Sequence, residues 1–108
     1  MKGSYGVVWR EGTRPLARGK LELLTSALRL DGLTESHPVT REIPYEELAG
    51  ARVGRATSER INGQPSLVLD RHDGVSIFVA AVAQPGLVAE LAERLAGLAT
   101  GTLSVGLA

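Results

Sequence analysis

The sequence predicts a mainly β, α+β domain in which about seven antiparallel strands form a bent barrel or two packed sheets. One C-terminal amphipathic helix is expected to cap them. The helix is predicted over Pro85–Leu98, because leucines recur there in steps of four and three residues, which place them on one helical face. Gly97 lies where such a helix is expected to end. The leucines of this stripe are Leu87, Leu91, Leu95 and Leu98.

Seven stretches before the helix alternate apolar with polar or small residues, the two-residue period of a strand with one buried face. In the first stretch Tyr5, Val7 and Trp9 share a face. We expect this face to belong to the core; the alternative is a partly exposed indole that contacts a protein. The fifth stretch is predicted to run from Ala49 toward Arg60. The seven stretches cover residues 4–10, 17–23, 28–31, 39–43, 49–60, 66–71 and 75–79.

Turn residues separate these stretches. Asp73-Gly74 is the clearest hairpin signal, because this pair tolerates positive φ between two strands. Asp31-Gly32 is expected to end the third strand, and Asn62-Gly63 to turn the chain before the sixth. Pro44 ends the fourth strand or places it at a sheet edge, because proline cannot donate to a ladder. Residues 45–48 are predicted to form a helical turn.

The chain has 108 residues, which is enough for one domain, predicted to span residues 1–98. The remaining residues, 99–108, are small, uncharged and mildly apolar. We expect this tail to be disordered or loosely docked. The alternative is a short extra strand, because Leu103, Val105 and Leu107 alternate with small residues.

Composition excludes several classes of function. Twelve basic and twelve acidic residues cancel, so the chain lacks the bulk positive charge that draws proteins to nucleic acid, and no nucleic-acid partner is expected. With no cysteine, the chain has no disulfide, thiolate zinc site or thiol nucleophile. This composition, and the absence of a signal-peptide pattern, favour a cytoplasmic protein. The content of Ala, Gly, Leu and Arg is typical of GC-rich bacterial genomes.

Catalytic and metal-binding motifs are missing from the sequence. It contains no Gly-x-Ser-x-Gly elbow and no phosphate-cradling glycine-rich loop. His72 lies beside two aspartates at a predicted hairpin tip, and His37 lies in a different loop, so no metal site is expected. The adjacent Glu46 and Glu47 point apart instead of forming an acid–base pair. The sequence therefore predicts a protein that is not an enzyme and needs no cofactor.

The order of seven strands and one C-terminal helix resembles the pleckstrin-homology-like superfold. The stretch REIPYEELAGARVGR, residues 41–55, is similar to the strand, short acidic turn and strand of small bacterial members and GRAM-type relatives. The resemblance covers most of residues 4–98. It implies a bent barrel or pair of sheets with the helix in one open corner. One departure is that the final helix of the better-known eukaryotic members carries a tryptophan, whereas the single tryptophan here is Trp9.

The resemblance also implies a candidate ligand site. Members that bind phosphoinositides do so through basic residues of the first two strands and the loop between them, positions occupied here by Arg10, Arg14, Arg18 and Lys20. Guanidinium and ammonium groups that converge on one anion would bind phosphate. Glu11 and neighbouring acidic residues dilute the positive charge. The alternative is that these residues form an ordinary solvated strand face.

These observations predict a noncatalytic interaction module that binds a protein partner or forms a homo-oligomer. The alternative function is the binding of anionic lipid headgroups or phosphorylated ligands through the basic first and second strands.

Overall fold

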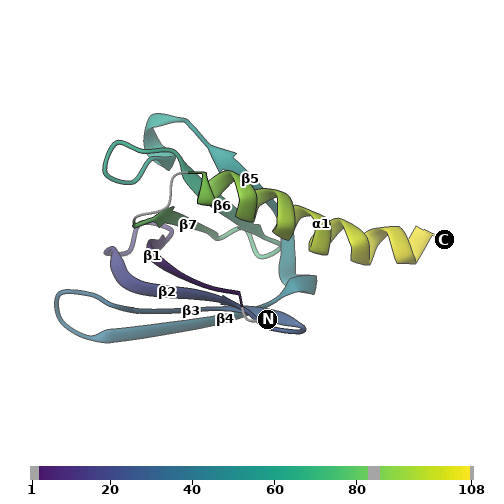
Figure 1. The fold of residues 1–108 in the computed structure, drawn as a ribbon, viewed down its shortest axis with the longest axis horizontal. Coiled ribbons are helices and arrows are strands. Elements are labelled where there is room, and N and C mark those ends of the chain that lie inside the picture. Colours follow the sequence, from purple (N-terminus) through teal and green to yellow (C-terminus); the bar gives the residue numbers. More distant parts are fainter. Residues whose placement is uncertain (1–2, 83–85, 108) are drawn as a thin grey trace.

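Seven antiparallel strands form one continuous sheet in the computed structural model, which describes residues 3–82 and 86–107 (Figure 1). The strand order is β4-β3-β2-β1-β7-β6-β5, and the predicted fold class is confirmed. A single α-helix follows the last strand. The elements are β1 Gly3–Glu11, β2 Ala17–Leu23, β3 Ala27–Leu33, β4 Pro38–Pro44, β5 Leu48–Gly54, β6 Ser66–Arg71, β7 Ser76–Ala81, the 3-10 turns η1 Tyr45–Glu47 and η2 Thr57–Glu59, and the helix α1 Leu87–Leu107.

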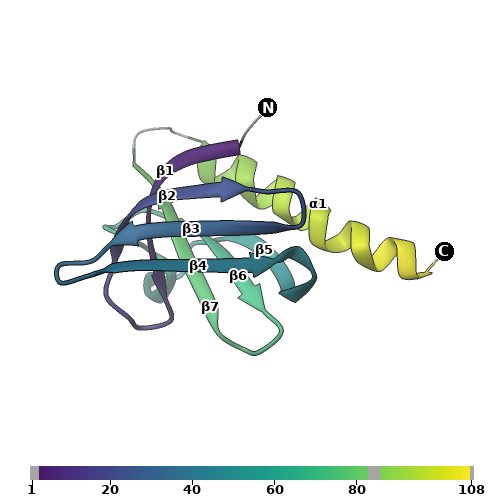
Figure 2. The same ribbon diagram turned by 90° about the horizontal axis from the view of Figure 1, so that it is seen from below.

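The sheet is curled into a half-barrel. Strand β1 lies in the middle and pairs with β2 on one side and β7 on the other. Figure 2 shows β2, β3 and β4 in front, with β6 and β7 running across them behind. Strands β4 and β5 stand at the two ends of the strand order and do not pair with each other, so the barrel is open. Pro44 therefore lies in an edge strand, one of the two placements predicted for it.

The core fills the concave side of the half-barrel and includes most of the residues predicted to face inward. Trp9 is 2% exposed, which confirms that the indole belongs to the core, while Tyr5 is only half-buried. Helix α1 lies against β5 and also contacts β6, β7 and η1. Its buried residues Leu87, Leu91 and Leu95 supply the apolar surface that covers this half of the sheet.

The helix continues past its predicted end. Leu98 is 41% exposed, so the prediction that it completes the buried stripe is wrong. Gly97 does not stop the helix, because a glycine in a helix interior is unfavourable by only about 1 kcal/mol and no proline follows. Helix α1 reaches Leu107, so the alternative of an extra strand in the tail is also wrong; Figure 1 shows the last turns extending beyond the sheet. The division into a domain of residues 1–98 and a tail stays a prediction, and Pro85 lies outside the described residues.

The pair Asp31-Gly32 lies inside β3, so the prediction that it ends this strand is wrong. The reason is the packing of Trp9, whose Nε1 donates to the backbone oxygen of Asp31 at 3.0 Å. A Cβ atom on Gly32 would lie 2.9 Å from Trp9 Nε1 and 2.7 Å from the Cβ of Ala17. Glycine is needed here for close packing of an indole and not for a turn.

Strand β5 ends at Gly54, so the prediction that it runs toward Arg60 is wrong. Residues 55–65 instead fold over the outer face of β6, where Ile61 is 2% exposed and Val68 is fully buried. Val68 faces away from the main core, because its neighbours Leu67 and Leu69 belong to it. Ile61 and Val68 are therefore buried outside the main core.

Candidate functional site

Three arginines surround one glutamate at an opening of the half-barrel. The Nε atom of Arg41 lies 2.9 Å from Oε1 of Glu11, and Nη1 of Arg71 lies 3.0 Å from Oε2 of the same carboxylate. The Nε atom of Arg14 is 3.8 Å from Oε1. The Glu11 side chain is only 14% exposed, so one carboxylate serves three guanidinium groups in a largely desolvated position.

Strand alternation brings these charges together. In β1, Glu11 lies on the same face as the buried Trp9, and in β4 Arg41 lies on the same face as Ile43. In β6, Arg71 continues the inward face. Each charged residue therefore occupies a position that points toward the interior, at or near the end of its strand. These charged side chains make this end of the otherwise apolar interior polar.

Acidic groups neutralise most of the arginine charge. Arg71 uses its Nη2 atom to pair with Asp73 at 3.2 Å, in addition to its contact with Glu11. Its Nε atom is buried and has no hydrogen-bond partner among the described residues. Three arginines and two carboxylates leave a net charge of +1 on this group, which we call the Glu11 cluster: Glu11, Arg14, Arg41, Arg71 and Asp73.

A cavity of about 370 Å³ adjoins the Glu11 cluster, and we call it the Trp9 cavity. Trp9 and two prolines give it an apolar wall, and Arg14 and Arg41 give it a cationic one. Nε of Arg41 binds Glu11 and its Nη1 donates to the oxygen of Thr40, so Nη2 has no partner within the described residues. The same holds for both terminal nitrogens of Arg14, whose side chain is 72% exposed. These N–H groups are donors for an anionic guest.

Of the four predicted site residues, only Arg14 reaches the Trp9 cavity. Arg10 lies on the outer face, where its guanidinium group stacks 4.3 Å from the ring centre of Phe78. It also donates to the backbone oxygens of Gly12 and, at 2.9 Å, of Ser58. Arg10 therefore joins the segment that follows β5 to the outer face of the sheet, and both of its terminal nitrogens are hydrogen-bonded.

Arg18 and Lys20 lie on the outer face of β2, opposite Val8 and Gly6 of β1. Lys20 lies 3.9 Å from Glu22, and Arg18 has no side-chain partner in the described ranges 3–82 and 86–107. The structure therefore brings Arg18 and Lys20 to one face and does not bring them together with Arg14. Whether any of the four binds a ligand stays a prediction.

Sequence reasoning missed Glu11, Arg41 and Arg71 as a group. The sequence carried one signal, a charged residue at a strand position whose alternate neighbours are apolar. Glu11 continues the series Tyr5, Val7 and Trp9. Arg71 continues the series Leu67 and Leu69. Strand pairing over long sequence separations, which the sequence does not reveal, is needed to join these positions.

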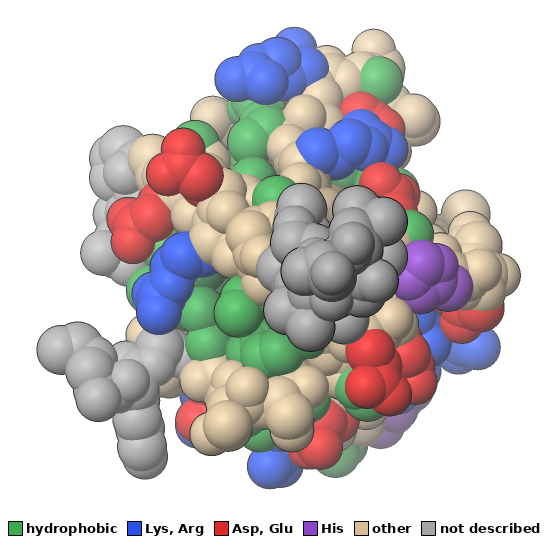
Figure 3. Space-filling model, turned by 90° about the vertical axis from the view of Figure 1, so that its right-hand side faces the viewer, with side chains coloured by type: hydrophobic (Ala, Val, Ile, Leu, Met, Phe, Trp, Pro, Cys, Tyr) green, Lys and Arg blue, Asp and Glu red, His purple; other side chains and the backbone are tan. Residues whose placement is uncertain are grey.

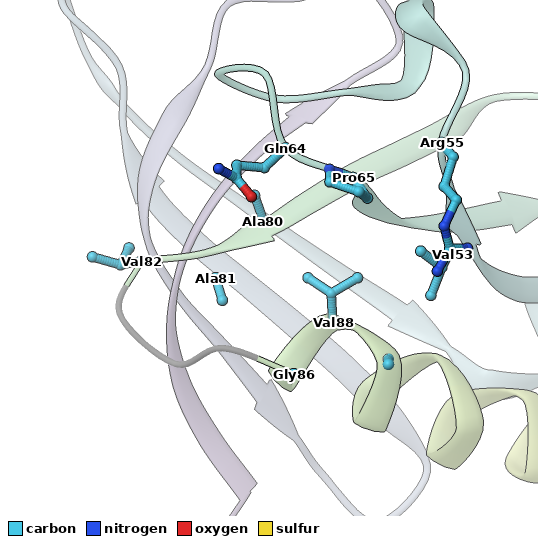
Figure 4. Close-up of a pocket in the computed structure, with 10 residues that line it drawn as sticks. Val53, Arg55, Gln64, Pro65, Ala80, Ala81, Val82, Gly86 and Val88 are labelled. Atoms are coloured by element: carbon cyan, nitrogen blue, oxygen red, sulfur yellow. The ribbon is translucent and has the colours of Figure 1, made fainter.

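Two further cavities lie elsewhere on the molecule. One, of about 470 Å³, lies on the outer face beside Leu16, Arg18 and Leu33. The other, of about 570 Å³, lies between the first turn of α1 and the segment before β6. Figure 4 shows Val88 of α1 directed toward Pro65 across this space, with the Arg55 side chain beside it.

The described residues show no grouping suited to metal binding. No three His, Cys, Asp or Glu side chains in the described ranges are placed to hold a metal ion. Burial raises the pKa of Tyr45, an effect opposed by the charge of Arg94 and by the hydrogen bond to Leu24. This hydroxyl donates to the Leu24 oxygen at 2.7 Å, and none of the three cavities is lined by Tyr45. Among the described residues, no helix has the length and apolar character needed to cross a membrane.

Comparison with known proteins supports the fold. No family model and no curated protein matches the chain. A solved structure, the C-terminal domain of an unknown protein from Leishmania infantum, is similar with a TM-score of 0.62 and 17% sequence identity. The similarity covers 82% of this chain and 76% of that one. At this identity the comparison shows the fold alone: a small antiparallel half-barrel with a C-terminal helix.

Proposed function

We propose that the chain is a noncatalytic, pleckstrin-homology-like interaction module that binds a protein partner. In this proposal the Trp9 cavity takes one anionic side chain of the partner, a carboxylate or a phosphate. The observation that carries it is that Arg14 and Arg41 line, together with Trp9, a cavity large enough for a side chain. A bacterial, cytoplasmic setting remains part of the proposal on compositional grounds.

The contacts of Glu11 support an anionic guest. Glu11 is itself a carboxylate bound by Arg14 and Arg41, so these side chains already lie in positions that suit an oxyanion. A second anion would use the terminal nitrogens that Glu11 leaves free. The apolar wall formed by Trp9, Pro15 and Pro38 would hold the aliphatic part of the same side chain.

Charge distribution favours one anionic group over a multiply charged lipid headgroup. The Glu11 cluster has a net charge of +1, and the four basic residues of the first two strands are split between the cavity and the outer face. Figure 3 shows acidic and basic side chains interspersed around the end of the molecule from which α1 projects. An anionic membrane binds surfaces on which several cations act together.

Titration with O-phosphoserine and with acetate tests the proposal. Trp9 is the single tryptophan, so its fluorescence and its indole N–H resonance report on the cavity directly. We expect both signals to change in a saturable, salt-sensitive way. Arg14→Ala should raise the Kd about tenfold, the equivalent of one charged hydrogen bond. Arg18→Ala is the matched control and should leave the Kd unchanged, because Arg18 lies outside the cavity.

Two results would contradict the proposal. One is the absence of any saturable response at millimolar ligand. The other is salt-sensitive binding to vesicles that contain phosphatidylserine, lost in the Arg18→Ala variant and retained in Arg14→Ala. That second result would support the lipid-binding alternative and place it on the outer face.

A further inference from the structure

We infer that a second copy of this chain docks on the outer face of the sheet, across a two-fold axis, through the cavity beside Leu33. This inference goes beyond the proposed ligand site, because it uses other charged side chains, although the two cavities share Ala17 and Thr34 in their walls. None of Glu11, Arg14 or Arg41 lines this cavity.

The surface has an exposed apolar centre. Leu33 is 61% exposed and Leu16 is 38% exposed, and both line the cavity of about 470 Å³ together with Val8. Strand pairing fixes their relative positions, because Val8 lies opposite Arg18 and Arg18 lies opposite Leu33 in the register of β1, β2 and β3. Exposed apolar side chains that lie together are a common feature of interaction surfaces, whereas single exposed leucines occur on any protein.

The rim of this surface carries one charge of each sign. Arg18 and Glu35 both line the cavity and are exposed. In the part of the chain that the structure describes, neither side chain has an ion pair or a hydrogen bond. A patch with an unpaired cation and an unpaired anion around an apolar centre is complementary to itself.

In a two-fold dimer the complementary charges would meet at two equivalent places. In an isologous dimer the same patch of both copies meets, so Arg18 of each copy would pair with Glu35 of the other. The leucines near the axis would pack together and leave the charged pairs at the rim, which is the usual arrangement of an interface. The formal net charge of zero removes the long-range repulsion between copies that a highly charged chain would have.

Charge exchange tests the inference. Sedimentation velocity of the full chain over about 5–500 μM would measure the dimer Kd. We expect Arg18→Glu and Glu35→Arg each to raise this Kd at least tenfold, and the double variant to return it to within about threefold of the parent. Glu93→Arg, at an exposed position of α1, is the control and should leave the Kd unchanged.

Leu33→Asp provides a second test that does not depend on the ion pairs. It should abolish the dimer without lowering the melting temperature of the monomer by more than about 2 °C, because the side chain is largely exposed. A parent protein that is monomeric throughout the concentration range would overturn the inference. So would single exchanges without effect, or a double exchange that does not restore association. Arg14→Ala, which changes the Trp9 cavity alone, should leave the dimer Kd unchanged, so a failure of ligand binding and a failure of dimerisation can be told apart.

Discussion

Helix α1 and the Glu11 cluster both close the interior of the half-barrel, and they do so with opposite chemistry. Helix α1 covers β5 with Leu87, Leu91 and Leu95, each at most 4% exposed. The Glu11 cluster closes another opening with paired charges that come from β1, β4 and β6. One part of the boundary is therefore mainly apolar and the other is ionic.

Because of this difference we expect α1 to contribute mainly to stability and the Glu11 cluster mainly to binding. Burial of leucine side chains is favourable without any partner of defined geometry, so α1 is expected to dominate the free energy of unfolding. Buried charges lose hydration and gain little net stability from their pairing. What the Glu11 cluster provides instead is a set of oriented donors beside a cavity.

Leu91→Ala should have the largest effect on the free energy of unfolding. Leu91 is fully buried in the middle of the stripe. Its truncation should lower this free energy by about 2–5 kcal/mol, because the transfer energy is lost and a cavity is left. Denaturant unfolding followed by circular dichroism measures the change.

Two variants control for this effect. Glu93→Ala changes an exposed position of α1 and should shift the free energy of unfolding by only a few tenths of a kcal/mol. Leu91→Asp should prevent folding at ordinary temperature, because it would bury a carboxylate without a partner. A melting temperature of Leu91→Ala within about 2 °C of the parent would show that α1 is not part of the core.

Glu11→Gln should have the next largest effect and should move stability and binding in opposite directions. The substitution leaves Arg41 and Arg71 without their shared counter-ion, which should lower the free energy of unfolding by about 1.5–3 kcal/mol. It also raises the charge of the cluster by one unit. The variant should therefore bind O-phosphoserine more tightly than the parent, as measured by Trp9 fluorescence.

Glu22→Gln is the matched control for Glu11→Gln. Its carboxylate has one contact, with Lys20 at 3.9 Å, and the Lys20 side chain is 52% exposed. Loss of this pair should change stability by at most about 0.5 kcal/mol. Equal effects of the two substitutions would mean that Glu11 has no special role in closing the interior.

Tyr45, in η1 beneath α1, makes the free energy of unfolding depend on pH. Burial raises the pKa of its hydroxyl above the ordinary value of 10.0, so the folded state holds this proton more tightly than the unfolded state. The resulting stability is complete below about pH 10 and is lost as the pH rises through the higher pKa of the folded state. Tyr45→Phe should abolish this part of the alkaline loss.

The same variant has a second effect, at neutral pH. Removal of the hydrogen bond to the Leu24 oxygen should lower the free energy of unfolding by about 1 kcal/mol. Unfolding curves of parent and variant at pH 8, 10 and 11 measure both effects. Curves that stay parallel across this range would refute the role of Tyr45 in the alkaline loss.

Gly97→Ala should have the smallest effect and should be stabilising. Gly97 is exposed in α1, and a Cβ atom there would meet nothing within 4 Å. Alanine should raise the free energy of unfolding by about 0.5–1 kcal/mol, because it lowers the entropy lost on forming a helix. Gly32→Ala is the contrasting variant and should destabilise, because its Cβ would collide with Ala17 and Trp9. A destabilising Gly97→Ala would indicate that the helix ends near this residue.

Local patterns were sufficient to predict most of the fold. The alternation in 4–10 and 66–71, the Asp73-Gly74 turn and the leucines of 87–95 each have one dominant local cause, and β1, β6, the β6–β7 hairpin and α1 follow them. The predictions were wrong where side-chain packing, and not the local sequence pattern, determines the structure. Asp31-Gly32 looks like a turn but accommodates Trp9, and residues 55–60 look like strand but cover Val68.

The candidate site was far less predictable. Arg14 was named from the sequence, but Arg41 and Arg71 reach Glu11 only because β1, β4 and β6 meet at one opening of the half-barrel. Local sequence carries no information about such pairing. A charged residue at an inward-facing strand position, such as Glu11, is the one feature of the sequence that could have marked the candidate site in advance.

The central place of β1 has a consequence for how the chain folds. Its register joins Val7 to Ala81 on one side and to Gly19 on the other. The β1–β2 hairpin closes over a short loop, whereas the pairing with β7 joins residues far apart in the sequence and must await synthesis of β7. Closure of long loops slows folding. During translation one edge of β1 therefore stays open until β7 leaves the ribosome, and an unpaired strand edge is a template for aggregation.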